Sequence, residues 1–66
     1  MNRIKEVLAE KGIKQKWLCE KLGKSYTQVN AYVQNRHQPR LEVLFEIAKI
    51  LGVPPKDLIA DLKNIK

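Results

Sequence analysis

Several side chains between residues 15 and 40 are of the types that contact nucleic acids. Glutamine and asparagine can bond two positions on a base edge, while threonine, tyrosine and small residues can meet a base, a methyl group or a sugar. The candidates for reading bases are Tyr26, Thr27, Gln28, Asn30 and Ala31. Amides, hydroxyls and cations also bind phosphate oxygens, and the candidates for that contact are Gln15, Lys24, Ser25, Asn35, Arg36 and Arg40.

Two short helices must hold these side chains. The sequence predicts one helix from Gln15 to Leu22, a tight turn on Gly23, and a second helix that opens at Ser25. Ser25 is a typical N-cap residue, and Gln28 three positions later completes a capping-box pattern. The residues that would seal the two helices together are Leu18, Cys19, Leu22, Val29 and Tyr32. The rest of the second helix then faces solvent without a negative charge, as the major groove of DNA requires.

Two of these residues have a second interpretation. Gln28 can either reach a base or spend its amide on the capping box with Ser25. Trp17 either packs against the first helix and the turn at Ile13 as part of the core, or marks the surface for a protein partner.

Apolar periodicity across the chain predicts an all-α, compact five-helix bundle without strands. The expected helices are 2–11, 15–22, 25–33, 41–51 and one that starts at Pro54-Pro55 and carries Leu58, Ile59, Leu62 and Ile65 on one side. The fourth helix should be nearly surrounded by protein, and its apolar residues include Leu41 and Phe45. In the loop before it, Asn35 is expected to take a positive φ, which Asn tolerates. We expect residues 1–66 to form a single domain.

The net charge of +6 is concentrated on the predicted helix pair and the loop after it. Residues 14–40 hold six basic residues and one acidic residue, a net +5. A solvated basic surface would explain the total, but its location favours a polyanionic partner. No apolar run is long enough to span a bilayer and no signal peptide is visible, so we expect a cytoplasmic protein that does not enter membranes.

Catalytic patterns are missing from the sequence. There is no nucleophile with a base, no paired carboxylates and no glycine-rich phosphate loop, so we expect no enzymatic activity and no cofactor. Cys19 is alone and predicted to be buried, and His37 has no second ligand nearby, so we expect no metal site.

The chain resembles the lambda-repressor-like (Cro/repressor-type) helix-turn-helix family over about Ile4 to Leu58. The resemblance is carried by residues 11–13, Gln15, residues 18–23, Ser25, Val29, Asn35-Arg36, Pro39, residues 41, 42 and 44, and residues 47–53. It implies five helices, with the second across the DNA backbone and the third in the major groove. By position, it implies that Gln15 meets a phosphate, that Tyr26, Thr27, Gln28 and Ala31 face bases, and that Asn35, Arg36 and Arg40 form a second phosphate clamp.

Four residues depart from the family's usual pattern. Cys19 stands where Ala is common, Lys24 where an apolar residue is common, Val33 where Glu is frequent and Asn35 where Gly is frequent. A cysteine is a small hydrophobe, so close helix packing should survive. Lys24 can lay its stem over the core edge and bring its ammonium to a phosphate.

The sequence therefore predicts a sequence-specific regulator of transcription that binds double-stranded DNA. A homodimer would read two half-sites, and its expected surface is the region of the fourth and fifth helices: Leu51, Val53, Pro54, Ile59, Leu62 and Ile65. The alternative is a protein-interaction module, antitoxin-like or partner-docking, that uses Trp17 and Tyr26.

Overall fold

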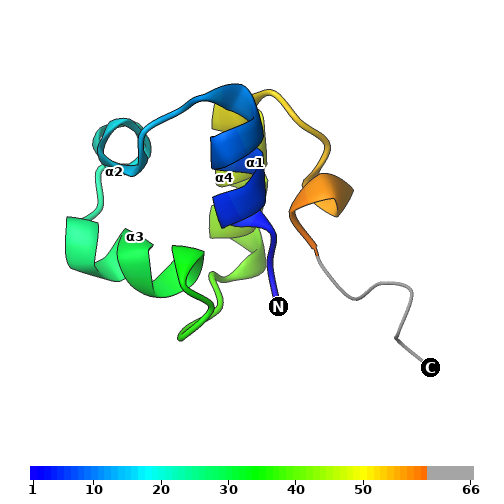
Figure 1. Ribbon diagram of the computed structural model, residues 1–66. Coiled ribbons are helices and arrows are strands. Elements are labelled where there is room, and N and C mark those ends of the chain that lie inside the picture. Colours follow the sequence, from blue (N-terminus) through cyan, green and yellow to red (C-terminus); the bar gives the residue numbers. More distant parts are fainter. Residues whose placement is uncertain (60–66) are drawn as a thin grey trace.

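The computed structural model describes residues 1–59, which contain four α-helices and one short 3-10 turn (Figure 1). The helices are α1 (Ile4–Lys11), α2 (Gln15–Leu22), α3 (Tyr26–Val33) and α4 (Leu41–Leu51), and the turn is η1 (Pro55–Leu58). The only β-type pairing in this range is an isolated antiparallel bridge between Asn2 and Ile59. The all-α prediction is thus confirmed for the described residues.

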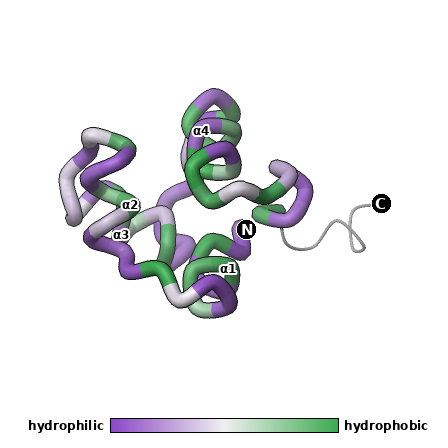
Figure 2. The backbone as a smooth tube through the Cα atoms, turned by 90° about the horizontal axis from the view of Figure 1, so that it is seen from above, coloured by the Kyte–Doolittle hydropathy of each residue, from purple (hydrophilic) through white to green (hydrophobic). Residues whose placement is uncertain are grey.

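The helix pair α2–α3 lies on one side of α1 and α4, and η1 lies on the opposite side (Figures 1 and 2). α2 packs against both α3 and α4, while α1 contacts α3 and η1. Hydrophobic residues recur on each helix between hydrophilic ones, as amphipathic helices around a common core require (Figure 2).

Every element contributes one side chain that is fully buried in this core. These are Ile4 of α1, Leu18 of α2, Val29 of α3, Ile47 of α4 and Leu58 of η1. Burying a side chain of this size contributes about 1.5–3 kcal/mol. The core therefore joins all five elements, and α3 is attached to it through the buried side chain of Val29.

The prediction of five helices is wrong for the described residues. After Pro54 the chain makes only the 3-10 turn, and Ile59 is already extended, with φ −105° and ψ 116°. Ile59 pairs there with Asn2 and packs on the core edge, so tertiary contacts replace helix propagation at this point. Leu62 and Ile65, expected on the fifth helix, lie outside the described residues.

Two further expectations fail. The first helix begins at Ile4 and not at Asn2, because Asn2 is drawn into the bridge with Ile59. Leu41 and Phe45 of α4 are 61% and 50% exposed and are not enclosed. A small domain cannot cover every apolar side chain, so even the most apolar helix presents some of its apolar residues to water. No helix in residues 1–59 combines the length and the apolar character that a bilayer crossing demands.

Candidate nucleic-acid interface

The turn between α2 and α3 has the geometry that the sequence predicts. Gly23 takes a left-handed conformation with φ 69°, and its N–H bonds to the carbonyls of Cys19 and Glu20. Lys24 N–H also reaches the carbonyl of Cys19, at 3.3 Å. These bonds form a Schellman-type cap, which satisfies the last carbonyls of α2 and turns the chain sharply. Ser25 then caps α3, as predicted, by accepting the backbone N–H of Gln28.

α3 buries one face and exposes the other. Val29, Tyr32 and Val33 are at most 4% exposed and point into the core. Tyr26 is 56% exposed, and Thr27 and Gln28 are also exposed. Asn30 and Ala31 are half-buried at the edges of this face. The five predicted base-reading residues therefore all belong to the part of α3 that is wholly or partly accessible.

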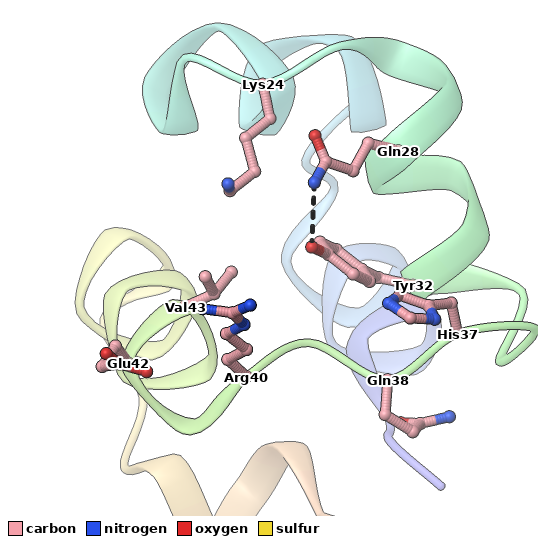
Figure 3. Close-up of a pocket in the computed structure, with 8 residues that line it drawn as sticks. All are labelled: Lys24, Gln28, Tyr32, His37, Gln38, Arg40, Glu42 and Val43. Atoms are coloured by element: carbon pink, nitrogen blue, oxygen red, sulfur yellow. Dashed lines mark hydrogen bonds between the residues drawn. The ribbon is translucent and has the colours of Figure 1, made fainter.

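The capping box around Gln28 is only half formed. The Ser25 hydroxyl accepts from the Gln28 backbone N–H at 3.1 Å, but the Gln28 side chain does not reach back to Ser25. Its Nε2 donates instead to the hydroxyl of Tyr32 at 3.3 Å, one helical turn further on (Figure 3). Of the two interpretations of Gln28, the capping role of its amide is thus wrong. This amide keeps its carbonyl oxygen and one N–H for another partner.

Gln15 and Asn30 link the start of α2 to the middle of α3. Gln15 Nε2 donates to Asn30 Oδ1 at 3.1 Å, and both side chains are half-buried. This bond aligns two residues that the sequence assigned separately, one to phosphate and one to bases. It leaves the Asn30 Nδ2 group and the Gln15 carbonyl oxygen for other contacts.

A polar cavity of about 370 Å³ lies between α3, the loop after it and the start of α4. Its lining comprises Lys24, Gln28, Tyr32, His37, Gln38, Arg40, Glu42 and Val43. Lys24 enters from the turn before α3 and Arg40 from the loop before α4, so the two cations converge on the same space (Figure 3). The rings of His37 and Tyr32 are stacked, with their centroids 5.9 Å apart.

The electrostatics of this region are strongly positive. The sequence has no acidic residue between Glu20 and Glu42, a range that includes all of α3 and the following loop. Within residues 1–59 the one ion pair joins Arg3 to Glu10 on α1. Lys24, Arg36 and Arg40 therefore form no ion pair with a carboxylate of the described residues, although Glu42 also lines the cavity.

Asn35 has the predicted left-handed conformation, with φ 61°. Its side chain, however, is used inside the protein: Oδ1 accepts from the Asn2 backbone N–H at 2.7 Å, and Nδ2 donates to the Asn2 carbonyl at 3.2 Å. Arg36 follows it with an exposed side chain, and the Arg36 N–H bonds to the carbonyl of Ala31 at 2.9 Å. The loop is thus anchored to the end of α3 and to the N-terminal segment.

The sequence matches the profile of the Cro/C1-type HTH DNA-binding domain over residues 3–63. The chain belongs to this family. The expected resemblance is therefore confirmed. The domain is also similar to a solved structure, "Crystal structure of a putative DNA-binding protein from Bacteroides fragilis", with 43% identity and a TM-score of 0.86. That match covers 88% of this chain and 94% of the other. No curated protein matches the chain.

Trp17 of this Cro/C1-type domain is not a core residue. Its side chain is 40% exposed, and the Lys21 ammonium lies 5.4 Å from the centre of its ring. The interpretation of Trp17 as part of the core is therefore wrong, because the buried core cluster does not include it. A cation over an aromatic face is a favourable contact that needs no partner protein.

The residues expected at a dimer surface differ in exposure: Pro54 is exposed, and Leu62 and Ile65 lie outside the described residues. Leu51 is only 4% exposed, and Val53 and Ile59 are partly buried against the core. Leu51 therefore cannot serve as an interface residue in the folded domain. The dimer remains a prediction.

Four residues of this region were not among the predicted site residues. The Tyr32 hydroxyl, His37 and Gln38 line the cavity, and Asn2 holds the loop. The spacing of four between Gln28 and Tyr32 is the one local signal, since such residues are neighbours on a helix. Within residues 1–59, no three His, Cys, Asp or Glu side chains lie together as metal ligands.

Proposed function

We propose that the domain binds double-stranded DNA sequence-specifically, with α3 in the major groove, and regulates transcription by occupying an operator. The observation that carries this proposal is the combination of two features. The exposed face of α3 is free of acidic residues, and it borders a cavity where Lys24 and Arg40 converge. A helix of this kind beside unpaired cations suits the groove and the adjoining phosphates.

Base reading falls to the exposed face of α3. Thr27 and Gln28 are exposed polar residues at its start, and Tyr26 beside them can pack on a sugar or a base. Gln28 is held by Tyr32, so its amide has a fixed orientation before DNA arrives. Ala31 is small and permits close approach, and Asn30 can offer its Nδ2 group beside the Gln15 contact.

Phosphate binding falls to the two ends of this surface. Lys24, Arg36 and Arg40 supply charge, and Gln15 and Ser25 supply neutral hydrogen bonds near the starts of α2 and α3. The Ser25 oxygen accepts from Gln28, which leaves its hydroxyl hydrogen for a phosphate. Such contacts fix register and orientation, while the bases supply discrimination.

A homodimer on two half-sites completes the proposal. One α3 reads only a few base pairs, and two copies about one helical turn apart would multiply the discrimination. We place the contact in the region after α4, where, among the described residues, Pro54 is exposed and Val53 and Ile59 are partly accessible.

Selection of binding sites from a random duplex pool tests the proposal. The wild-type protein should enrich one short motif, and Gln28→Ala should relax one base position at a cost of about 1–3 kcal/mol. Enrichment of no motif at all would contradict sequence-specific binding. An equal loss on every sequence would remove Gln28 from base reading.

The exposure of Trp17 and Tyr26 supports one alternative function, that of a protein-interaction module. The two functions differ in their response to salt. DNA retention that falls steeply between about 50 and 200 mM salt supports our proposal, because each phosphate contact releases counterions. Retention that barely changes over this range would favour the rival.

A further inference from the structure

Asn2 is the one buried polar residue among the described residues, with 5% of its surface exposed. Nδ2 of its side chain donates to the Tyr32 carbonyl at 2.9 Å and to Gln38 Oε1 at 3.0 Å. Its Oδ1 accepts the Ile4 N–H at 3.1 Å, at the start of α1. The side chain thus uses both of its amide hydrogens and its oxygen, and it connects α1, the end of α3 and the loop.

Asn2, Asn35 and Gln38 form a closed set of hydrogen bonds, which we call the amide clasp. Asn35 pairs with both the N–H and the carbonyl of Asn2, as a neighbouring backbone strand would. The Gln38 side chain donates through Nε2 to Asn35 Oδ1 at 3.1 Å, and its Oε1 accepts from Asn2 Nδ2. Every amide of the clasp both donates and accepts, which a carboxylate cannot do.

The clasp fixes the segment that carries two of the proposed phosphate-binding residues. Arg36 follows Asn35 directly, and Arg40 lies two residues after Gln38. The other side of Asn2 is held by the bridge to Ile59, and the Arg3 N–H bonds to the Leu58 carbonyl at 2.8 Å. The N-terminal segment is therefore bonded on one side to η1 and Ile59 and on the other side to the loop between α3 and α4.

We infer that the amide clasp positions the α3–α4 loop for DNA, so that Asn2 sets DNA affinity through Arg36 and Arg40 without touching DNA itself. The inference rests on the proposed function. It gives Asn35, expected from the sequence to bind phosphate, a positioning role through its contacts with Asn2. It also explains why a residue at the chain's beginning is buried beside a loop 33 residues away.

The test variant is Asn2→Ser, which adds no charge. A serine oxygen can still accept from Ile4 N–H, but the two donated bonds to Tyr32 and Gln38 are lost. Affinity for a selected duplex is measured well below the unfolding temperature of each variant. We expect a loss of about tenfold, within the range by which coupled residues affect one another.

A double-mutant cycle separates positioning from general damage. In a background with both Arg36→Gln and Arg40→Gln, Asn2→Ser should no longer change affinity, because the cations that it positions are gone. An equal loss in both backgrounds, or no loss in either, would overturn the inference. The matched control is Gln34→Ser, because Gln34 is exposed beside Asn35 and no described group bonds to its side chain. The affinity of the Gln34→Ser variant for the duplex should stay within about twofold of the wild-type affinity.

A measurement without DNA judges the clasp independently. The N–H groups of Arg36 and His37 bond to the Ala31 carbonyl, and Asn2→Ser should speed their hydrogen exchange about tenfold. The Val29 amide inside α3 should be unchanged; equal acceleration there, or none in the loop, would contradict local positioning. Should wild type ignore DNA while the loop amides respond, the proposed function fails and the clasp stands as a loop anchor only. If Asn2→Ser does not fold, Asn35→Gly removes the other half of the clasp, the two bonds to the Asn2 backbone, and keeps the left-handed backbone.

Discussion

Arg40→Gln should flatten the salt dependence of DNA binding. Arg40 lines the cavity opposite Lys24, and the described residues offer it no acidic partner in an ion pair. Three cations, Lys24, Arg36 and Arg40, give a slope of log affinity against log salt of about −2.7 per domain. Removing one should change it to about −1.8.

This change has a measurable size. Between about 50 and 200 mM salt, three contacts cost about 40-fold in affinity and two contacts about 12-fold. Two wild-type copies on two half-sites would double the slope to about −5.4, so the same data report the number of bound copies. Fluorescence anisotropy with a labelled duplex at four or five salt concentrations provides the slopes.

Lys49→Gln is the matched control for this experiment. It removes the same charge from the far end of α4, about 13 Å along the helix from Arg40. Beyond about one Debye length an exposed charge is largely screened, so its slope should equal that of wild type. If Arg40→Gln also keeps the wild-type slope, Arg40 does not neutralise a phosphate and the cavity is not part of the DNA contact.

Three further predictions concern the scaffold that holds α3. Ser25→Ala should lower the free energy of unfolding by about 1 kcal/mol, and Ser25→Gly by only a few tenths, as measured in urea, because the cap to Gln28 is lost; an unchanged midpoint for Ser25→Ala would contradict this role. Gly23→Ala should cost about 1–2 kcal/mol in the same assay, since a Cβ there meets no atom within 4 Å and only the left-handed backbone is strained; a neutral effect would show that the turn relaxes. Burial raises the pKa of the Cys19 thiol, so alkylation of Cys19 should be slow until the domain unfolds, and rapid alkylation of the folded protein would contradict that burial. The free energy of unfolding should also fall as the pH rises above the ordinary thiol pKa, because the unfolded chain loses the thiol proton first.

The helix-turn-helix could be predicted because its signals are local. Gly23 ends α2 and Ser25 caps α3 through bonds that span three or four residues. The apolar positions Val29 and Tyr32 then decide which face of α3 turns inward. Local signals of this kind are independent of the rest of the chain, so they survive in the folded domain.

Contacts between distant segments were not predictable. Asn2 and Asn35 are 33 residues apart, and nothing in either neighbourhood indicates that their amides meet. The extended backbone at Ile59 depends on pairing with the same N-terminal segment. The local sequence around Ile59 does not show that pairing, so it wrongly predicted a helix there. The Gln28 side chain had two possible local partners, and it bonds to the Tyr32 hydroxyl one turn away and not to the backbone of Ser25.

The exposed side of α4 shows a different limit of sequence patterns. The many apolar residues of α4 predicted that little of the helix would face water, yet Leu41 and Phe45 remain half or more exposed. Hydropathy identifies side chains that gain from burial, but it does not show whether the chain has enough surface to cover them.

Mapping backbone amide shifts during titration with a selected duplex tests the central claim most directly. We predict that the largest changes fall on residues 25–31 of α3 and residues 36–40 of the loop. The outer sides of α1 and α4, represented by Lys5 and Lys49, should stay unchanged. Changes centred on Trp17 and Lys21, with α3 unaffected, would contradict the claim that α3 enters the groove.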